Sequence, residues 1–192
     1  VLFNGRLDRE LSANAAALGQ SDAQAAIAAA RHEGFSARTI IFLDQEEGGR
    51  MLPEQKAYLF AWVDEIIRGR FRAGVYCSGI SYREASGASV VTAEDIRSNA
   101  GRHDITFWVT NDACPPSPGC APGAKPLPRS SGIDFAEVWQ FAQSPRRKDV
   151  ASQCHGYDSD GSCYSPPAAG KRRDIDLDTA TSADPSHGRT GK

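Results

Sequence analysis

The stretch of sequence that decides the fold is Thr39-Ile-Ile-Phe-Leu-Asp-Gln-Glu-Glu-Gly-Gly49. Its four successive apolar residues are typical of a strand that is buried on both faces of a parallel sheet. Because side chains alternate along a strand, Phe42, Asp44 and Glu46 share one face. Two carboxyls therefore leave the C-terminal end of a hydrophobic strand on the same side, where α/β proteins hold ligands and catalytic groups.

The Asp44 and Glu46 pair has two interpretations. A polar strand end, or a cap of the following helix, needs no function at all. Two close carboxylates, however, repel each other and separate their pKa values, which suits acid and base chemistry. Catalysis is therefore one hypothesis for this pair, and a polar strand end without a function is the alternative.

Composition excludes several classes of partner. The chain has 192 residues, of which 24% are charged and 40% hydrophobic, as in a globular protein with a substantial core. A net charge of −2 gives no reason to expect nucleic acid or an anionic membrane as a partner. No apolar run approaches the roughly 18 residues of a transmembrane helix. We expect a monomer without a metal or another cofactor.

The five cysteines predict two disulfides and one buried thiol. Cys114 and Cys120 lie in one Pro/Gly-rich loop, and Cys154 and Cys163 lie close together in another irregular segment. These short spacings suit a local disulfide within each pair, whereas a zinc site is the alternative and usually has tighter Cys spacing. Disulfides predict a secreted or cell-wall-associated protein. Cys77, in an apolar strand, is the expected free thiol.

Capping and periodicity predict three helices. The first starts at a capping-box pattern at Ser21 and ends at Gly34, after a stretch, 6–20, that is a short helix or a loop. The second starts at Pro53 and ends at Gly69, and the third covers 92–99 or 92–101. A loop is expected over 80–91. The expected strands are 1–3, 39–43, 73–77, 105–110, 137–142 and 173–178.

Strands that alternate with helices predict a parallel sheet with right-handed crossovers. We expect an α/β fold, a (β/α)8 TIM-type barrel with loop-rich C-terminal units, over residues 1–180. The chain starts without Met at the end of a strand, so the first βα units of the barrel are expected to be missing. Residues 181–192 are expected to be disordered. An open doubly wound sheet is the alternative, but the Gly-rich phosphate loop that usually follows its first strand is absent.

Short motifs along the chain resemble the strands of a known family. The segments that resemble the family-25 glycoside hydrolases, the Chalaropsis-type muramidases, are Phe42-Leu-Asp-Gln-Glu46, Gly74-Val-Tyr76, Phe107-Trp-Val109, Val138-Trp-Gln-Phe141 and Ile175-Asp-Leu177. A related group is still more similar, the glycoside-hydrolase-like barrels once called domain of unknown function 1906. It shares the opening Phe-Asn-Gly5, the Cys-containing loop after the Trp strand and the closing Asp176-Leu-Asp-Thr-Ala180.

The resemblance implies a barrel that cleaves glycans of the bacterial wall, with a polysaccharide or peptidoglycan as substrate. By position, Glu46 corresponds to the general acid, whose pKa must rise so that it stays protonated. Asp44 would stay ionised and stabilise positive charge or orient an acetamido group. Asp176 corresponds to the Asp of the closing strand. The family also carries an active-site Asp on its first strand, which would precede this sequence.

Four further residues are candidates for lining a sugar site: Tyr76, Trp108, Asn111 and Gln140. Aromatic faces pack against the apolar side of a pyranose, and amides bond its hydroxyls. Core packing is the alternative for Trp108. The strand with Asp174, Asp176 and Asp178 on one face has a rival interpretation as a hard-cation site.

Two other classes of function remain open. A barrel of this kind can bind wall glycan without cleaving it, because fold does not decide activity. A metal-dependent phosphodiester hydrolase would need several His or carboxylate ligands at strand ends. The four histidines, at 32, 103, 155 and 187, all fall in helices or loops, which argues against that class.

Overall fold

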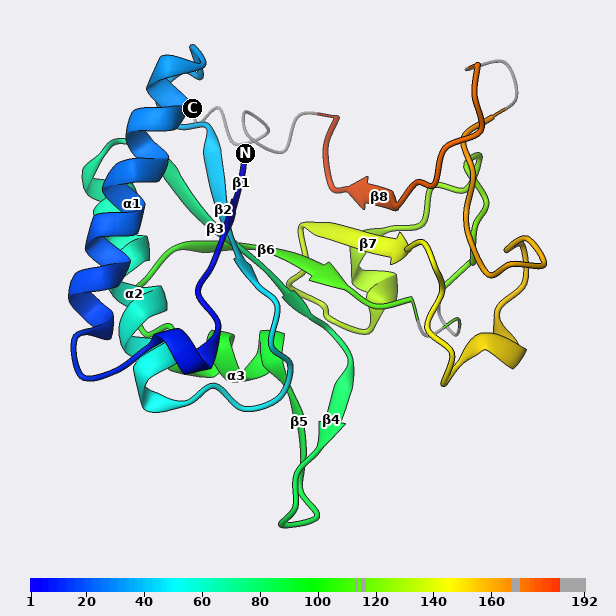
Figure 1. The fold of residues 1–192 in the computed structure, drawn as a ribbon, viewed down its shortest axis with the longest axis horizontal. Helices are drawn as coiled ribbons and strands as arrows, with labels where there is room; N and C mark the ends of the chain where they lie inside the picture. Colours follow the sequence, from blue (N-terminus) through cyan, green and yellow to red (C-terminus); the bar gives the residue numbers. More distant parts are fainter. Residues whose placement is uncertain (113, 115–116, 167–169, 184–192) are drawn as a thin grey trace.

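A computed structural model describes residues 1–112, 114, 117–166 and 170–183 of the chain (Figure 1). One six-stranded sheet has the order β1-β2-β3-β6-β7-β8, and a separate hairpin contains β4 and β5. The strands are β1 (Leu2–Asn4), β2 (Ile40–Gln45), β3 (Arg72–Ser78), β4 (Ser81–Arg83), β5 (Ser89–Val91), β6 (Ile105–Thr110), β7 (Val138–Ala142) and β8 (Leu177–Ala180). The helices are α1 (Ala15–His32), α2 (Pro53–Arg68) and α3 (Thr92–Asn99).

The sheet is mostly parallel, as predicted, but it is not a closed eight-stranded barrel. Strands β1, β2, β3, β6 and β7 run parallel, while β8 runs antiparallel to β7. Within the described residues, β1 and β8 are the two free edges of the sheet. The result is a mixed α/β fold consistent with a TIM-like architecture, in which the described strands form an open, curved sheet.

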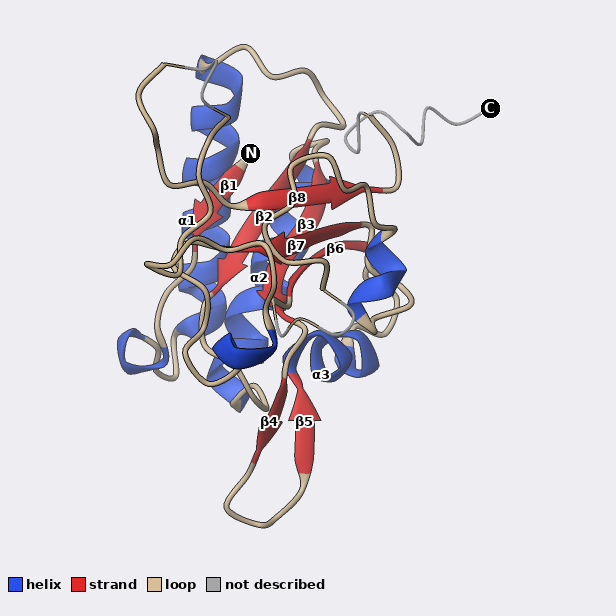
Figure 2. Cartoon of the chain, turned by 90° about the vertical axis from the view of Figure 1, so that its right-hand side faces the viewer, coloured by secondary structure: helices blue, strands red, loops and turns tan. Residues whose placement is uncertain are grey.

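The helices cover one face of the sheet (Figures 1 and 2). The main core joins residues of α1, α2 and α3 to alternate strand residues such as Ile41, Leu43 and Val75. None of the described helices contributes to the cluster on the other face. A doubly wound sheet has helices on both faces, so this part of the chain does not form the alternative fold. None of the described helices is long and apolar enough to span a membrane.

The uncovered face of the sheet is curved. Ile40 and Phe42 of β2 pack with Val138 of β7, although β3 and β6 lie between these two strands. The sheet therefore bends so that the inner faces of β2 and β7 meet, as in the wall of a barrel. Gly74 of β3 makes room for this contact, because a Cβ there would lie 2.4 Å from the Phe42 ring and 2.9 Å from Ile40.

The first helix begins earlier than predicted. α1 starts at Ala15, so Ser21 lies inside the helix and does not cap it. The side chain of Asp22 accepts hydrogen bonds from Arg6 at 2.6 and 2.9 Å and from the Tyr58 hydroxyl at 2.8 Å. The alanines before Ser21 have high helix propensity, and this propensity together with packing on α2 outweighs the local capping pattern.

Two further segments differ from the prediction. Residues 80–91, expected as a loop, contain the β4–β5 hairpin, whose strands have three residues each and are mostly exposed. The last strand was expected over 173–178, yet β8 covers Leu177–Ala180. A β-bulge lies in the pairing of β8 with β7 between Gln140 and Ala142. Short exposed strands lack the hydrophobic alternation by which a strand is recognised.

Two disulfides are present, as predicted, but the predicted pairing is wrong. Cys114 bonds to Cys154 and Cys120 bonds to Cys163, so each bond joins the loop after β6 to the segment after β7. Sequence proximity favoured local pairs, whereas the fold brings the two loops together. Cys77 is a buried free thiol, as expected. Disulfides are compatible with an extracellular protein.

We predict that Gly74→Ala lowers the free energy of unfolding by about 1–3 kcal/mol, because the new methyl group would displace the Phe42 ring in a packed cluster. Urea denaturation at 25 °C measures the change. Gly123→Ala is the matched control, because a Cβ at Gly123 meets nothing within 4 Å. The control should stay within about 0.5 kcal/mol of the wild type. Equal stability of both variants would contradict the packing described for the inner face.

Candidate active site

The strand register arranges polar side chains in two rows on the inner face of the sheet. The first row holds Asp44, Tyr76 and Trp108, and the second holds Ser78, Thr110 and Gln140. Register partners in a sheet point to the same face, so each row is continuous across neighbouring strands. Both rows lie toward the C-terminal ends of the parallel strands, as expected for a site in an α/β protein.

Asp44 and Glu46 lie beside each other at the end of β2, where Glu46 affects the pKa of Asp44. Asp44 is 8% exposed and is the last inward-facing residue of the strand, whereas Glu46 lies beyond the strand end and is exposed. Loss of hydration, the charge of Glu46 and a hydrogen bond with Glu46 together raise the pKa of Asp44 to about 6. A hydrogen bond between two carboxyls requires a proton, so the pair can keep one proton in mildly acidic solution.

The burial of the two carboxyls differs from the expectation. From the sequence, Glu46 was to be protonated by an apolar wall while Asp44 stayed ionised. The structure buries Asp44 instead, and it is the pKa of Asp44 that is raised. Asp44 is buried because it lies within strand β2, directly after the buried residue Leu43, whereas Glu46 lies beyond the end of the strand and is exposed to solvent.

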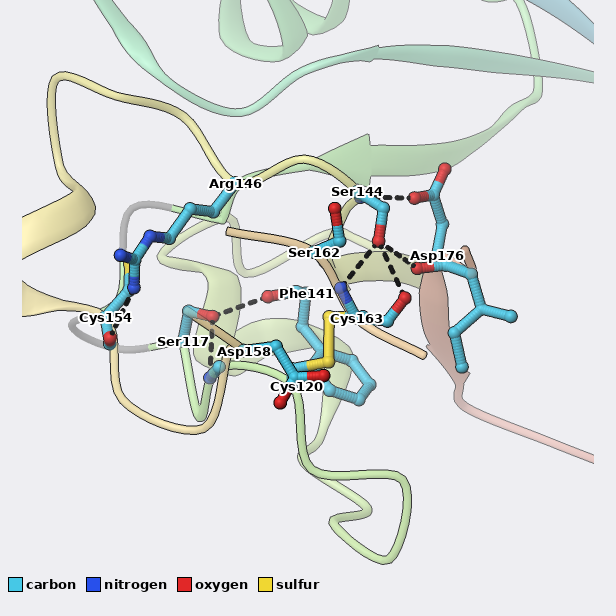
Figure 3. The surroundings of a disulfide bond; sticks show 12 residues. Ser117, Cys120, Phe141, Ser144, Arg146, Cys154, Asp158, Ser162, Cys163 and Asp176 are labelled. Carbon is cyan, nitrogen blue, oxygen red and sulfur yellow. Dashed lines mark hydrogen bonds between the residues drawn. A yellow bond between two sulfur atoms is a disulfide. The ribbon is translucent and has the colours of Figure 1, made fainter. Parts of the chain in front are cut away.

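Asp176 joins the site through a chain of hydrogen bonds. The Tyr76 hydroxyl donates to Gln140 Oε1 at 2.7 Å, and Gln140 Nε2 donates to Asp176 Oδ2 at 3.2 Å. The backbone N–H of Ser144 donates to Asp176 Oδ1 at 2.8 Å, as Figure 3 shows. Burial raises the pKa of Tyr76 to about 12, and the charges of Asp44, Glu46 and Asp176 add to the shift. All three carboxylates therefore lie close enough to the Tyr76 hydroxyl to affect its pKa.

A cavity of about 290 Å³ lies over these residues. Its lining is mostly polar and comes from four neighbouring strands and the segments that follow them: Gln45, Glu46, Tyr76, Ser78, Thr110, Gln140, Gln143, Ser144 and Asp176. Glu46 and Asp176, far apart in the sequence, thus face the same space. Asp44 lies beside it, and its Oδ1 is buried without a hydrogen-bond partner among the described residues.

Trp108 and Asn111 lie outside the lining of this cavity. The Trp108 ring stands edge-on to Tyr76 at a centroid distance of 5.1 Å, and its Nε1 donates to Asp178 Oδ1 at 2.8 Å. Trp108 is therefore a neighbour of the cavity on the inner face. The Asn111 side chain donates instead to the carbonyl of Ser131 at 3.0 Å, which ties two loops together.

Comparison with known protein families gives a match for this chain. A family model, described as "Rv2525c-like, glycoside hydrolase-like domain", matches residues 4–118, more than half of the chain. The chain belongs to this glycoside hydrolase-like family. The matched range includes Asp44, Glu46 and Tyr76, while Gln140 and Asp176 follow it and are brought to them by the fold.

A comparison with curated proteins gives no match. One solved structure is similar, described as a "1.07 A crystal structure of an uncharacterized B. stearothermophilus protein". It is 21% identical, with a TM-score of 0.48, over 79% of this chain and 71% of that chain.

Sequence reasoning missed several residues of this cavity. Thr110 has the inward position that was attributed to Asn111, and alternation from Trp108 would have identified it. Ser78 could have been found in the same way from Tyr76. Gln143 and Ser144 follow β7 in an irregular segment, where periodicity gives no information.

The rival metal interpretations find no support in the described part of the chain. No group of three or more His, Cys, Asp or Glu side chains there could hold a metal ion. The three aspartates that were expected on one strand face have different surroundings: Asp174 precedes β8, Asp176 accepts hydrogen bonds from Gln140 and Ser144, and Asp178 accepts one from Trp108. The cysteines of the zinc alternative form disulfides.

We predict that Asp44→Asn stabilises the folded domain at pH 7. The pKa of Asp44 is raised from 3.8 to about 6 in the folded state. The folded protein therefore has its full stability below about pH 4, where Asp44 is protonated, and loses stability as the pH rises through 6 and Asp44 ionises. The neutral amide does not pay this penalty, and the gain at pH 7 should be about 1–3 kcal/mol, falling to zero near pH 4.

Urea denaturation at pH 4 and pH 7 measures this difference. Asp134→Asn, at an exposed position, is the control and should change the unfolding free energy by less than about 0.5 kcal/mol at either pH. A loss of stability in Asp44→Asn at pH 7 would show that ionised Asp44 is well accommodated in the fold.

Proposed function

We propose that this domain is a glycosidase that cleaves bacterial cell-wall glycan with paired carboxylates. The observation that carries the proposal is that Glu46 and Asp176 line one cavity while Asp44 lies beside Glu46. Glycoside cleavage needs a proton donor and a second carboxylate close to the scissile bond. Membership of a glycoside hydrolase-like family supports a glycan ligand, and the resemblance to family-25 muramidases supports cell-wall glycan in particular.

The proton comes from the Asp44–Glu46 pair in this mechanism. Burial, together with the charge and the hydrogen bond of Glu46, raises the pKa of Asp44 to about 6, so Asp44 holds a proton below about pH 6. Glu46 is exposed in the cavity, so it passes this proton from Asp44 to the leaving oxygen, and both carboxyls are then ionised. Asp176, held by Gln140 and the Ser144 amide, lies across the cavity and stabilises the positive charge that develops on the sugar.

Other residues in and beside the cavity bind the sugar. Gln140 and Thr110 offer an amide and a hydroxyl to sugar hydroxyls, and Tyr76 is held beside them by its bond to Gln140. Trp108 extends the inner face next to Tyr76 as an aromatic surface for a pyranose ring. Asn111 has no part in this proposal because its amide faces the Ser131 carbonyl.

The exposed position of Glu46 favours a second candidate function, a domain that binds wall glycan without cleaving it. A general acid is usually kept protonated by an apolar surrounding, and solvent reaches Glu46 at the rim. Purified peptidoglycan distinguishes the two functions. A glycosidase releases new reducing ends, whereas a binding domain sediments with the glycan and releases none.

We predict that Glu46→Gln reduces the release of reducing ends from peptidoglycan by about 10²–10⁴-fold, because the amide cannot donate the proton. Glu47→Gln is the matched control on the next residue. Glu47 accepts hydrogen bonds from the Asp8 amide at 2.7 Å and from Gln55 at 2.8 Å, away from the cavity, so its variant should keep most of the activity. Full activity of Glu46→Gln would refute the assignment.

We also predict that kcat/KM falls as the pH rises above about 6, where Asp44 loses its proton. The decline should approach about tenfold per pH unit, as for an essential acid. Turnover of solubilised glycan between pH 4 and pH 8 measures the profile. A rate that is constant up to pH 8 would exclude this pair as the proton donor.

A further inference from the structure

One wall of the cavity has almost no regular secondary structure. Ser144 and Asp176 belong to the chain between β7 and β8, which contains a single short 3-10 helix (Ala151–Gln153) among its described residues. In such a segment, specific contacts add to the packing of the flanking residues Ile175 and Leu177 against the core. The contacts that hold this wall therefore decide where the Asp176 carboxyl lies.

Ser144 is the centre of these contacts (Figure 3). Its N–H donates to Asp176 Oδ1 at 2.8 Å. Its hydroxyl accepts from the Cys163 N–H at 2.7 Å and lies 3.0 Å and 2.9 Å from the carbonyls of Cys163 and Ile175, either of which can accept its proton. Ser144 thus connects Ile175, Asp176 and Cys163.

Cys163 is fixed by a disulfide. It is fully buried, it bonds to Cys120, and its carbonyl accepts a hydrogen bond from the Ile175 N–H at 3.1 Å. The Cys120–Cys163 bond spans 43 residues of sequence and attaches the wall to the loop that follows β6. A cross-link of this length restricts the chain strongly, so its removal would free the wall to move.

The second disulfide offers a matched comparison. Cys114–Cys154 also joins the two loops, with a sequence separation of 40. Its contacts are different: the Cys154 carbonyl accepts from Arg146, and its sulfur lies 3.6 Å from the Asp112 carbonyl. The hydrogen bonds of Ser144 and Asp176 described above involve neither Cys114 nor Cys154.

We infer that the Cys120–Cys163 disulfide and the Ser144 hydroxyl together hold Asp176 in the cavity, so that the site is complete only in the oxidised protein. Ser144 is a positioning residue in this scheme. A dithiol reductant would supply two electrons and two protons, the S–S bond would become two thiols, and the reductant would become a cyclic disulfide. The consequence for activity rests on the proposed function, whereas the effect on the wall does not.

Amide hydrogen exchange followed by NMR tests the inference without any substrate. In Cys120→Ser/Cys163→Ser and in Ser144→Ala, we expect exchange of the amides at positions 144 and 163 to accelerate by at least about tenfold. Cys114→Ser/Cys154→Ser should change the same amides by less than about threefold. Ser144→Ala retains both disulfides, so it tests the wall even if the double variant fails to fold.

Turnover of peptidoglycan is the second readout. Ser144→Ala and Cys120→Ser/Cys163→Ser should lose at least about tenfold in kcat/KM, and Ser144→Thr, which keeps a hydroxyl, should restore most of it. Unchanged exchange at both amides in Ser144→Ala overturns the inference, and so does an equal effect of Cys114→Ser/Cys154→Ser. A wild-type protein without turnover would refute the proposed function alone, because the exchange result is independent of it.

Discussion

Strand β2 is buried on both faces, and this burial is the constraint on which the site depends. Its outer residues, Ile41 and Leu43, pack under the helices, while Ile40 and Phe42 pack with Val138 on the inner face. The strand cannot move without disrupting both clusters. The next inward side chain, Asp44, is therefore held out of water beside Glu46, and its raised pKa is a direct result of that position.

The two halves of the site are held in different ways. The carboxyl pair is attached to a strand whose place is fixed by core packing and by pairing with β1 and β3. Asp176 lies in a loop-rich segment, where Ile175 and Leu177 pack against the core and hydrogen bonds from Gln140 and Ser144 hold the carboxylate. The disulfide at Cys163 connects this segment to the rest of the fold. The cavity therefore has one wall fixed by a core strand and another held by hydrogen bonds and a disulfide.

Much of the fold could be predicted because its elements have strong local patterns. The buried run of β2, the proline at the start of α2 and the apolar strand β6 all lie where sequence periodicity places them. The predictions fail where the local sequence pattern is weak or misleading. The capping motif at Ser21 is overridden by a longer helix, and the β4–β5 hairpin has too few buried residues to be recognised.

The sequence by itself determined the sheet, its mostly parallel order and the same-face placement of Asp44 and Glu46, because alternation along a strand is a local property. Only the tertiary structure decided which carboxyl is buried and that Asp176 reaches the cavity. It also decided the pairing of the cysteines. These facts depend on how distant segments approach one another, and long-range contact, unlike strand alternation, leaves no periodic trace in a single sequence.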